Sequence, residues 1–105
     1  MNYVENLTDV NEKIFHKLSD ENVKADTESE LADYYIDEVF NAMDMLNISR
    51  AETHPRVSNH ISEIISHIES LIHEGYAYES NGSVYFNVDR FDRYGELSNQ
   101  NLSDM

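Results

Sequence analysis

The sequence predicts a mainly helical α+β fold of three helices and one β-hairpin, with a short N-terminal strand. Three observations lead to it. Apolar residues recur at helical spacing in three separate stretches, an Asn-Gly pair divides two short strand-like runs, and the opening stretch NYVEN is typical of a strand. A chain of 105 residues suffices for one domain, and a domain of this size buries about 65% of the surface exposed by its unfolded chain.

The N-terminal part, residues 1–24, is expected to contain the strand and the first helix. After NYVEN, apolar residues recur at helical spacing from Val10 to Leu18, so we expect the helix to begin near residue 9. Asp9 and Glu12 have the spacing of a capping box, in which each side chain accepts a backbone N–H at the helix start. Residues 25–105 are expected to form one compact unit.

The second and third helices each have a broad apolar stripe. The second is predicted from the spacing of Leu31, Tyr35, Val39, Ala42 and Leu46. For the third, Ser58 is a plausible N-cap, and Gly75 suits the left-handed position that follows a helix. Its apolar face is continuous and consists of Ile61, Ile64, Ile65, Ile68, Leu71 and Ile72.

The hairpin is predicted at about residues 76–88. Asn81-Gly82 favours a type I′ turn, because both central residues of that turn need a positive φ. With this turn, Tyr78 lies opposite Tyr85 in the predicted register.

Composition excludes several classes of function. Seven Lys and Arg stand against 21 Asp and Glu, and the net charge of −14 opposes nucleic-acid binding by this chain alone. The sequence has no cysteine, which excludes disulfides, thiolate zinc sites and a thiol nucleophile. The N-terminus has no signal-peptide pattern and no apolar run has the length of a membrane span, so we expect a soluble, cytoplasmic protein without a membrane partner.

Candidate sites are few, and spacing indicates no catalytic residue. His60, Glu63 and His67 share one helix edge and are weak candidates for zinc ligands. A histidine at the border of an apolar face is usually packed or capped, so we predict no metal site here. The sequence contains no Gly-rich phosphate loop and no nucleophile elbow.

Longer stretches carry more information than these motifs. Four stretches matter here. Two follow one another in the second half of the chain, HPRVSNHISEIISHIESLIHEGYAY and NGSVYFNVDRFDRYGELS, and two lie upstream of them, YVENLTDVNEKI and DMLNI. The first two resemble the part of cysteinyl-tRNA synthetases where Pro-Arg-x-(Ser/Thr) opens a helix, followed by Gly-x-Ala-Tyr, Gly-x-Val-Tyr-Phe-x-Val and Tyr-Gly-x-Leu-Ser. The others are similar to that family's Asn-(Ile/Leu)-Thr-Asp-(Val/Ile)-Asp-Asp-Lys-Ile and Asp-x-Leu-Asn-(Ile/Val). The resemblance covers nearly all of the chain in the same order.

The resemblance implies a place for the N-terminal stretch within a Rossmann-like catalytic domain. It implies that Thr8 lies at the edge of the pocket for cysteine and its adenylate; the alternative is that Thr8 only helps to cap the first helix. Asn11 and Glu12 depart from the family's Asp-Asp pair. Because the strand would be an orphan from a parallel sheet, we expect NYVEN to leave backbone groups unpaired and to fray, dock on a helix or pair with another chain.

The resemblance also implies a parent enzyme that ligates cysteine to tRNA(Cys) with ATP through cysteinyl-adenylate, using Mg and zinc. The family's His-x-Gly-His and Lys-Met-Ser-Lys-Ser signatures are absent from these residues. We therefore expect a catalytic-domain fragment with no cofactor of its own, incompetent in isolation. Its partners would be the missing parts of the synthetase, with tRNA and cysteine bound only by the full enzyme. The alternatives are a free-standing interaction module derived from a synthetase and a fragment of the related mycothiol-pathway cysteine ligase.

Overall fold

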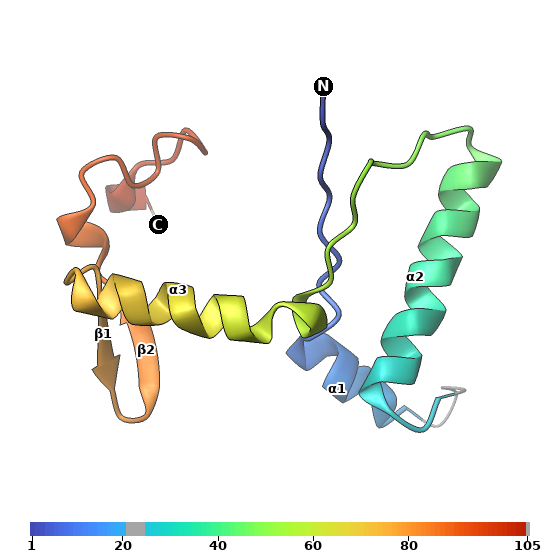
Figure 1. Cartoon of the computed structure of the whole chain (residues 1–105), viewed down its shortest axis with the longest axis horizontal. Coiled ribbons are helices and arrows are strands. Elements are labelled where there is room, and N and C mark those ends of the chain that lie inside the picture. Colours follow the sequence, from blue (N-terminus) through green and yellow to red (C-terminus); the bar gives the residue numbers. More distant parts are fainter. Residues whose placement is uncertain (21–24, 105) are drawn as a thin grey trace. The chain divides into compact units, whose positions relative to one another are not determined.

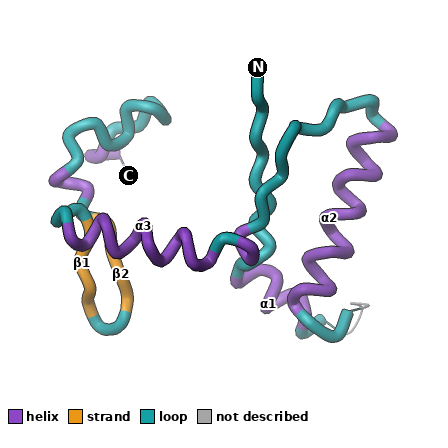
Figure 2. Tube along the Cα trace, viewed as in Figure 1, coloured by secondary structure: helices purple, strands orange, loops and turns teal. Residues whose placement is uncertain are grey.

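The computed structural model describes residues 1–20 and 25–104, which form two compact units, Met1–Ile61 and Ser62–Met105. The described residues contain three α-helices and one antiparallel hairpin, so the predicted fold class is confirmed (Figures 1 and 2). The helices are α1 (Glu12–Leu18), α2 (Glu28–Met45) and α3 (Ile61–His73), and the strands are β1 (Ala77–Ser80) and β2 (Ser83–Phe86). Short 3-10 helices cover Val57–Asn59, Val88–Arg90 and Leu102–Asp104. The predicted division at residues 24 and 25 stays a prediction.

In the first unit, the extended N-terminal segment runs parallel to residues 52–57 (Figure 1). Four backbone hydrogen bonds join the two segments: Glu52 N–H to Tyr3 C=O, Glu5 N–H to Thr53 C=O, Leu7 N–H to Pro55 C=O and Val57 N–H to Leu7 C=O, at 2.8 to 3.2 Å. The expectation that this strand is an orphan is therefore wrong, because it has a parallel partner within the chain. That it frays, docks on a helix or pairs with another chain stays a prediction. A parallel partner needs a crossover of at least a dozen residues, and the stretch containing α1 and α2 provides one within the chain.

Helix α1 begins later than expected, at Glu12. Its N-cap is Asn11, whose side chain accepts the N–H of Lys13 at 2.9 Å. The predicted capping box of Asp9 and Glu12 is wrong, because the Asp9 carboxylate accepts hydrogen bonds from Ser58 instead. A partner distant in the sequence outweighs the local capping pattern.

Helix α2 supplies most of the small core of the first unit. Thr27 caps it by accepting the N–H of Glu30 at 3.2 Å. Leu31 and Ala32 in its first turns are 3% and 6% exposed, where α1 packs on α2. Toward the C-terminal end of the helix the apolar stripe is exposed to solvent, since Val39 is 52% and Leu46 71% exposed.

In the second unit, α3 ends as the sequence predicts. Gly75 has φ +83°, its N–H donates to the carbonyl of Ile72, and the N–H of Tyr76 donates to that of Leu71. This pair of bonds is a Schellman motif. The start was wrongly predicted, because Ser58 lies in a 3-10 helix and α3 begins at Ile61. The isoleucine face remains open, with Ile65 52% exposed.

The hairpin has the predicted turn and register. Asn81 and Gly82 have φ of 52° and 80°, and Tyr78 pairs with Tyr85 while Ala77 pairs with Phe86. The two tyrosine rings stack with centroids 5.8 Å apart. On the other face, Phe86 packs on the aromatic rings that follow it, Phe91 and Tyr94.

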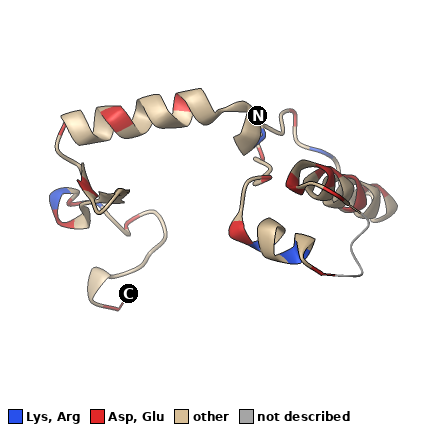
Figure 3. Cartoon of the chain, turned by 90° about the horizontal axis from the view of Figure 1, so that it is seen from below, with Lys and Arg blue, Asp and Glu red and all other residues tan. Residues whose placement is uncertain are grey.

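Acidic residues occur along both units, with few basic residues among them (Figure 3). No helix in the described ranges is long and apolar enough to cross a membrane.

Candidate functional site

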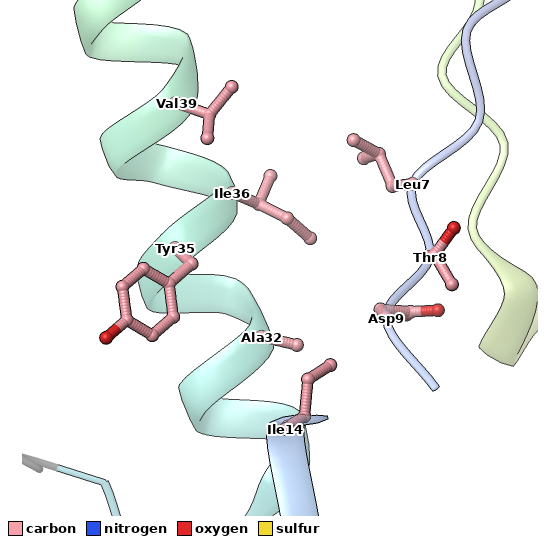
Figure 4. Close-up of a pocket in the computed structure, with 8 residues that line it drawn as sticks. All are labelled: Leu7, Thr8, Asp9, Ile14, Ala32, Tyr35, Ile36 and Val39. Atoms are coloured by element: carbon pink, nitrogen blue, oxygen red, sulfur yellow. The ribbon is translucent and has the colours of Figure 1, made fainter. Parts of the chain in front are cut away.

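A mainly apolar cavity of about 240 Å³ lies in the first unit, between the N-terminal segment and α2 (Figure 4). Its lining consists of Leu7, Thr8, Asp9, Ile14, Ala32, Tyr35, Ile36 and Val39. Leu7 and Ile36 point toward one another across it, whereas Thr8 and Asp9 direct their side chains away from α2. The apolar lining suits a hydrocarbon group, and the side chains of Thr8 and Asp9 face the opposite side of the N-terminal segment.

Thr8 occupies a three-residue turn beside this cavity. The N–H of Asp9 donates to the carbonyl of Leu7 at 3.1 Å, which closes the turn around Thr8. The amide of Asn6 donates to the Thr8 hydroxyl oxygen at 3.2 Å. The side chain of Thr8 is exposed, and the N-cap of α1 is Asn11 rather than Thr8. The turn therefore presents a hydroxyl that can still donate its proton.

The carboxylate of Asp9 is tied to Ser58. One oxygen accepts the backbone N–H of Ser58 at 2.9 Å and the other accepts its hydroxyl at 2.5 Å. Desolvation raises the pKa of Asp9, but the two bonds from Ser58, its own backbone N–H and the charge of Arg56 outweigh this and lower the pKa below its usual 3.8. Asp9 is therefore held as a carboxylate at neutral pH.

Arg56 connects the same region to α2. Its guanidinium donates to the carboxylate of Asp33 at 2.5 Å. The hydrogen bond that Arg56 donates to this carboxylate is the main cause that raises the pKa of Arg56 above its ordinary value. Arg56 thus binds a residue of α2, whereas Ser58, two residues later, binds a residue of the N-terminal segment.

His54, which the sequence did not single out, connects the N-terminal segment to α2. Its Nδ1 lies 3.0 Å from the carbonyl of Glu5, so the tautomer with Nδ1–H donates there. The ring packs edge-on against Phe40 of α2, with centroids 4.9 Å apart. Its Nε2 is buried and has no hydrogen-bond partner among the residues that the structure describes. The available signal was Pro55, which restricts His54 to an extended conformation suited to strand pairing.

The structure gives His60, one of the weak metal candidates, another partner. Its Nδ1 lies 2.7 Å from the carbonyl oxygen of Arg56. Glu63 and His67 border an open hollow on α3, and the other residues that line this hollow are serines. Within residues 1–20 and 25–104, no three His, Asp or Glu side chains are grouped so as to hold a metal ion. The described residues do not fit a zinc site.

Comparison with known proteins shows the class of protein to which this chain belongs. The family model for the catalytic domain of class I (C) tRNA synthetases matches residues 1–105. The chain belongs to this family.

The curated relatives narrow the comparison to one kind of synthetase. The chain is 49% identical over 105 residues to the cysteine–tRNA ligase of Haloarcula marismortui and 47% identical over 103 residues to that of Halobacterium salinarum. It is 43% identical over 103 residues to the cysteine–tRNA ligase of Staphylococcus haemolyticus. These matches cover 98–100% of the chain but 21–22% of each relative, so the chain spans about a fifth of the length of the curated relatives it matches. The resemblance to cysteinyl-tRNA synthetases is confirmed.

Proposed function

We propose that this chain serves as a segment of the catalytic domain of a cysteine–tRNA ligase. In the complete enzyme, ATP activates cysteine as cysteinyl-adenylate, and the cysteinyl group is then transferred to tRNA(Cys). The observation that supports this most strongly is 49% identity to the Haloarcula marismortui ligase along the whole chain. Because the curated relatives are cysteine–tRNA ligases, the mycothiol-pathway alternative is not favoured.

The segment contributes structure and one edge of the substrate pocket. Thr8 stands at that edge, where its exposed hydroxyl follows the parallel pairing of residues 3–7 with residues 52–57. The chemistry of activation lies with residues outside these 105, since the chain has neither phosphate-binding signature and its described residues do not fit the family's zinc. The isolated chain is catalytically incompetent, and its partners are the remaining parts of the synthetase in the cytoplasm.

A segment exchange tests the proposal. The matching segment of the Haloarcula marismortui ligase is replaced by this chain, and cysteinylation of tRNA(Cys) is measured against the unmodified ligase. We expect the chimera to retain cysteinylation. A second chimera carrying Thr8→Val keeps the shape of the side chain and loses its hydroxyl, so the KM for cysteine is expected to rise. If the chimera that keeps Thr8 is folded but does not cysteinylate tRNA(Cys), the proposal is contradicted.

A further inference from the structure

We propose that Asp9 and Ser58 are positioning residues that hold the Thr8 hydroxyl at the edge of the substrate pocket, an inference that rests on the function proposed above. Neither residue is proposed to touch the substrate. They act through the backbone turn at Thr8, and the substrate class is an amino acid or its adenylate.

The turn itself is weakly held by local bonds. A hydrogen bond between residues two apart closes a small ring with poor geometry, and the bond from Asp9 to Leu7 is of this kind. The Leu7 carbonyl also accepts the N–H of Val57 at 3.2 Å, which anchors the residue before Thr8. The residue after Thr8 is Asp9, and its side chain supplies the other anchor.

That second anchor has two points of attachment. Both carboxylate oxygens of Asp9 accept hydrogen bonds from Ser58, one from the backbone and one from the hydroxyl. Two bonds to one charged carboxylate fix its orientation as well as its distance, and charge-assisted bonds are about twice as strong as neutral ones. Thr8 is thereby held between Val57 on one side and Ser58 on the other.

Other roles for Asp9 are already filled by different residues. Asn11 caps α1, and the guanidinium of Arg56 donates to Asp33 rather than to Asp9. The Asp9 carboxylate is therefore available to Ser58, which donates one hydrogen bond to each of its two oxygens.

The position of the Thr8 hydroxyl gives this arrangement a consequence for binding. Its oxygen accepts from Asn6, which leaves the proton free to be donated to a carboxylate or carbonyl oxygen of a bound amino acid. A displacement of about 1 Å can cost up to about a hundredfold in a positioned site. Loosening the anchor is therefore expected to weaken cysteine binding without removing any group that contacts cysteine.

Kinetics in the active chimera test the positioning role. We expect Ser58→Ala and Asp9→Asn each to raise the KM for cysteine about tenfold with kcat changed less than about twofold, because a contact made equally in ground and transition states is weakened. Ser58→Thr keeps the hydroxyl and should restore the parental KM. Thr27→Ala removes the hydroxyl that caps α2, so it is the matched structural control: stability falls and the KM for cysteine stays unchanged.

Amide hydrogen exchange on the 105-residue chain gives a readout independent of activity. Exchange at the Asp9 N–H should accelerate about tenfold in Ser58→Ala and remain at the parental rate in Thr27→Ala. Faster exchange with an unchanged KM would overturn the positioning role, and unchanged exchange would overturn the anchor itself. If the chimera with parental residues is inactive, the proposed function is contradicted. The exchange rate of the Asp9 N–H then shows by itself whether Ser58 anchors the turn.

Discussion

Arg90 donates a hydrogen bond to the carbonyl of Gly75 at 3.0 Å, at the point where α3 ends and the chain turns into the hairpin. Gly75 has φ +83°, and a Cβ atom added there would overlap the guanidinium of Arg90. The end of the helix is thus fixed by a left-handed residue and by a cation that binds the carbonyl of that residue.

The first prediction concerns Gly75→Ala. Left-handed backbone costs a residue with a Cβ about 1–2 kcal/mol, and Arg90 must also move away from the carbonyl it caps. We expect a loss of unfolding free energy above about 2 kcal/mol in urea denaturation.

Gly82→Ala is the matched control for that substitution. Gly82 has φ +80°, and no atom lies within 4 Å of its added Cβ, so only the backbone cost applies. Equal losses for the two alanine variants would show that Arg90 contributes nothing at the end of α3.

The second prediction concerns the cap of α2. Thr27→Ala leaves the N–H of Glu30 without its side-chain acceptor, and loss of such a cap costs about 1 kcal/mol. Thr27→Ser keeps the oxygen and should retain most of that stability. Thermal unfolding followed by circular dichroism compares the three chains. If the serine variant is as unstable as the alanine variant, the hydroxyl is not the source of the stabilisation.

The third prediction is a pH dependence that Asp9 imposes. Its pKa is lower in the folded chain than the ordinary 3.8, so the unfolded chain binds more protons in that range. The stabilisation is complete above the unfolded pKa and is lost as the pH falls through the folded one. Urea midpoints between pH 6 and about pH 2 should fall less in Asp9→Asn than in the parent chain. Parallel curves for the two proteins would contradict the anchoring of Asp9 by Ser58.

The fourth prediction concerns salt. With 21 acidic and seven basic side chains, repulsive charge pairs outnumber attractive ones. Raising the ionic strength from about 0.1 M to 1 M shortens the screening length from about 10 Å to about 3 Å, so stability should rise. The urea midpoint measured in NaCl checks this. Glu69→Gln combined with Glu79→Gln should weaken the dependence, and a midpoint that falls with salt would show that the few ion pairs outweigh the repulsion.

How much the sequence could predict depended on how local each interaction is. The Asn81-Gly82 turn determines its own conformation, so the hairpin register was predicted correctly. The end of α3 at Gly75 was predicted for the same reason. The candidate site was harder, because Asp9 and Ser58 are 49 positions apart and both looked like helix caps. Likewise, nothing local to NYVEN indicated that residues 52–57 would lie beside it.

Cysteine-dependent exchange between ATP and pyrophosphate, run in parallel on the isolated chain and on the Haloarcula marismortui chimera, shows whether this segment shapes the pocket while other residues activate cysteine. We expect exchange by the chimera and none by the isolated chain. Exchange by the isolated chain, or a folded chimera without exchange, would contradict this account.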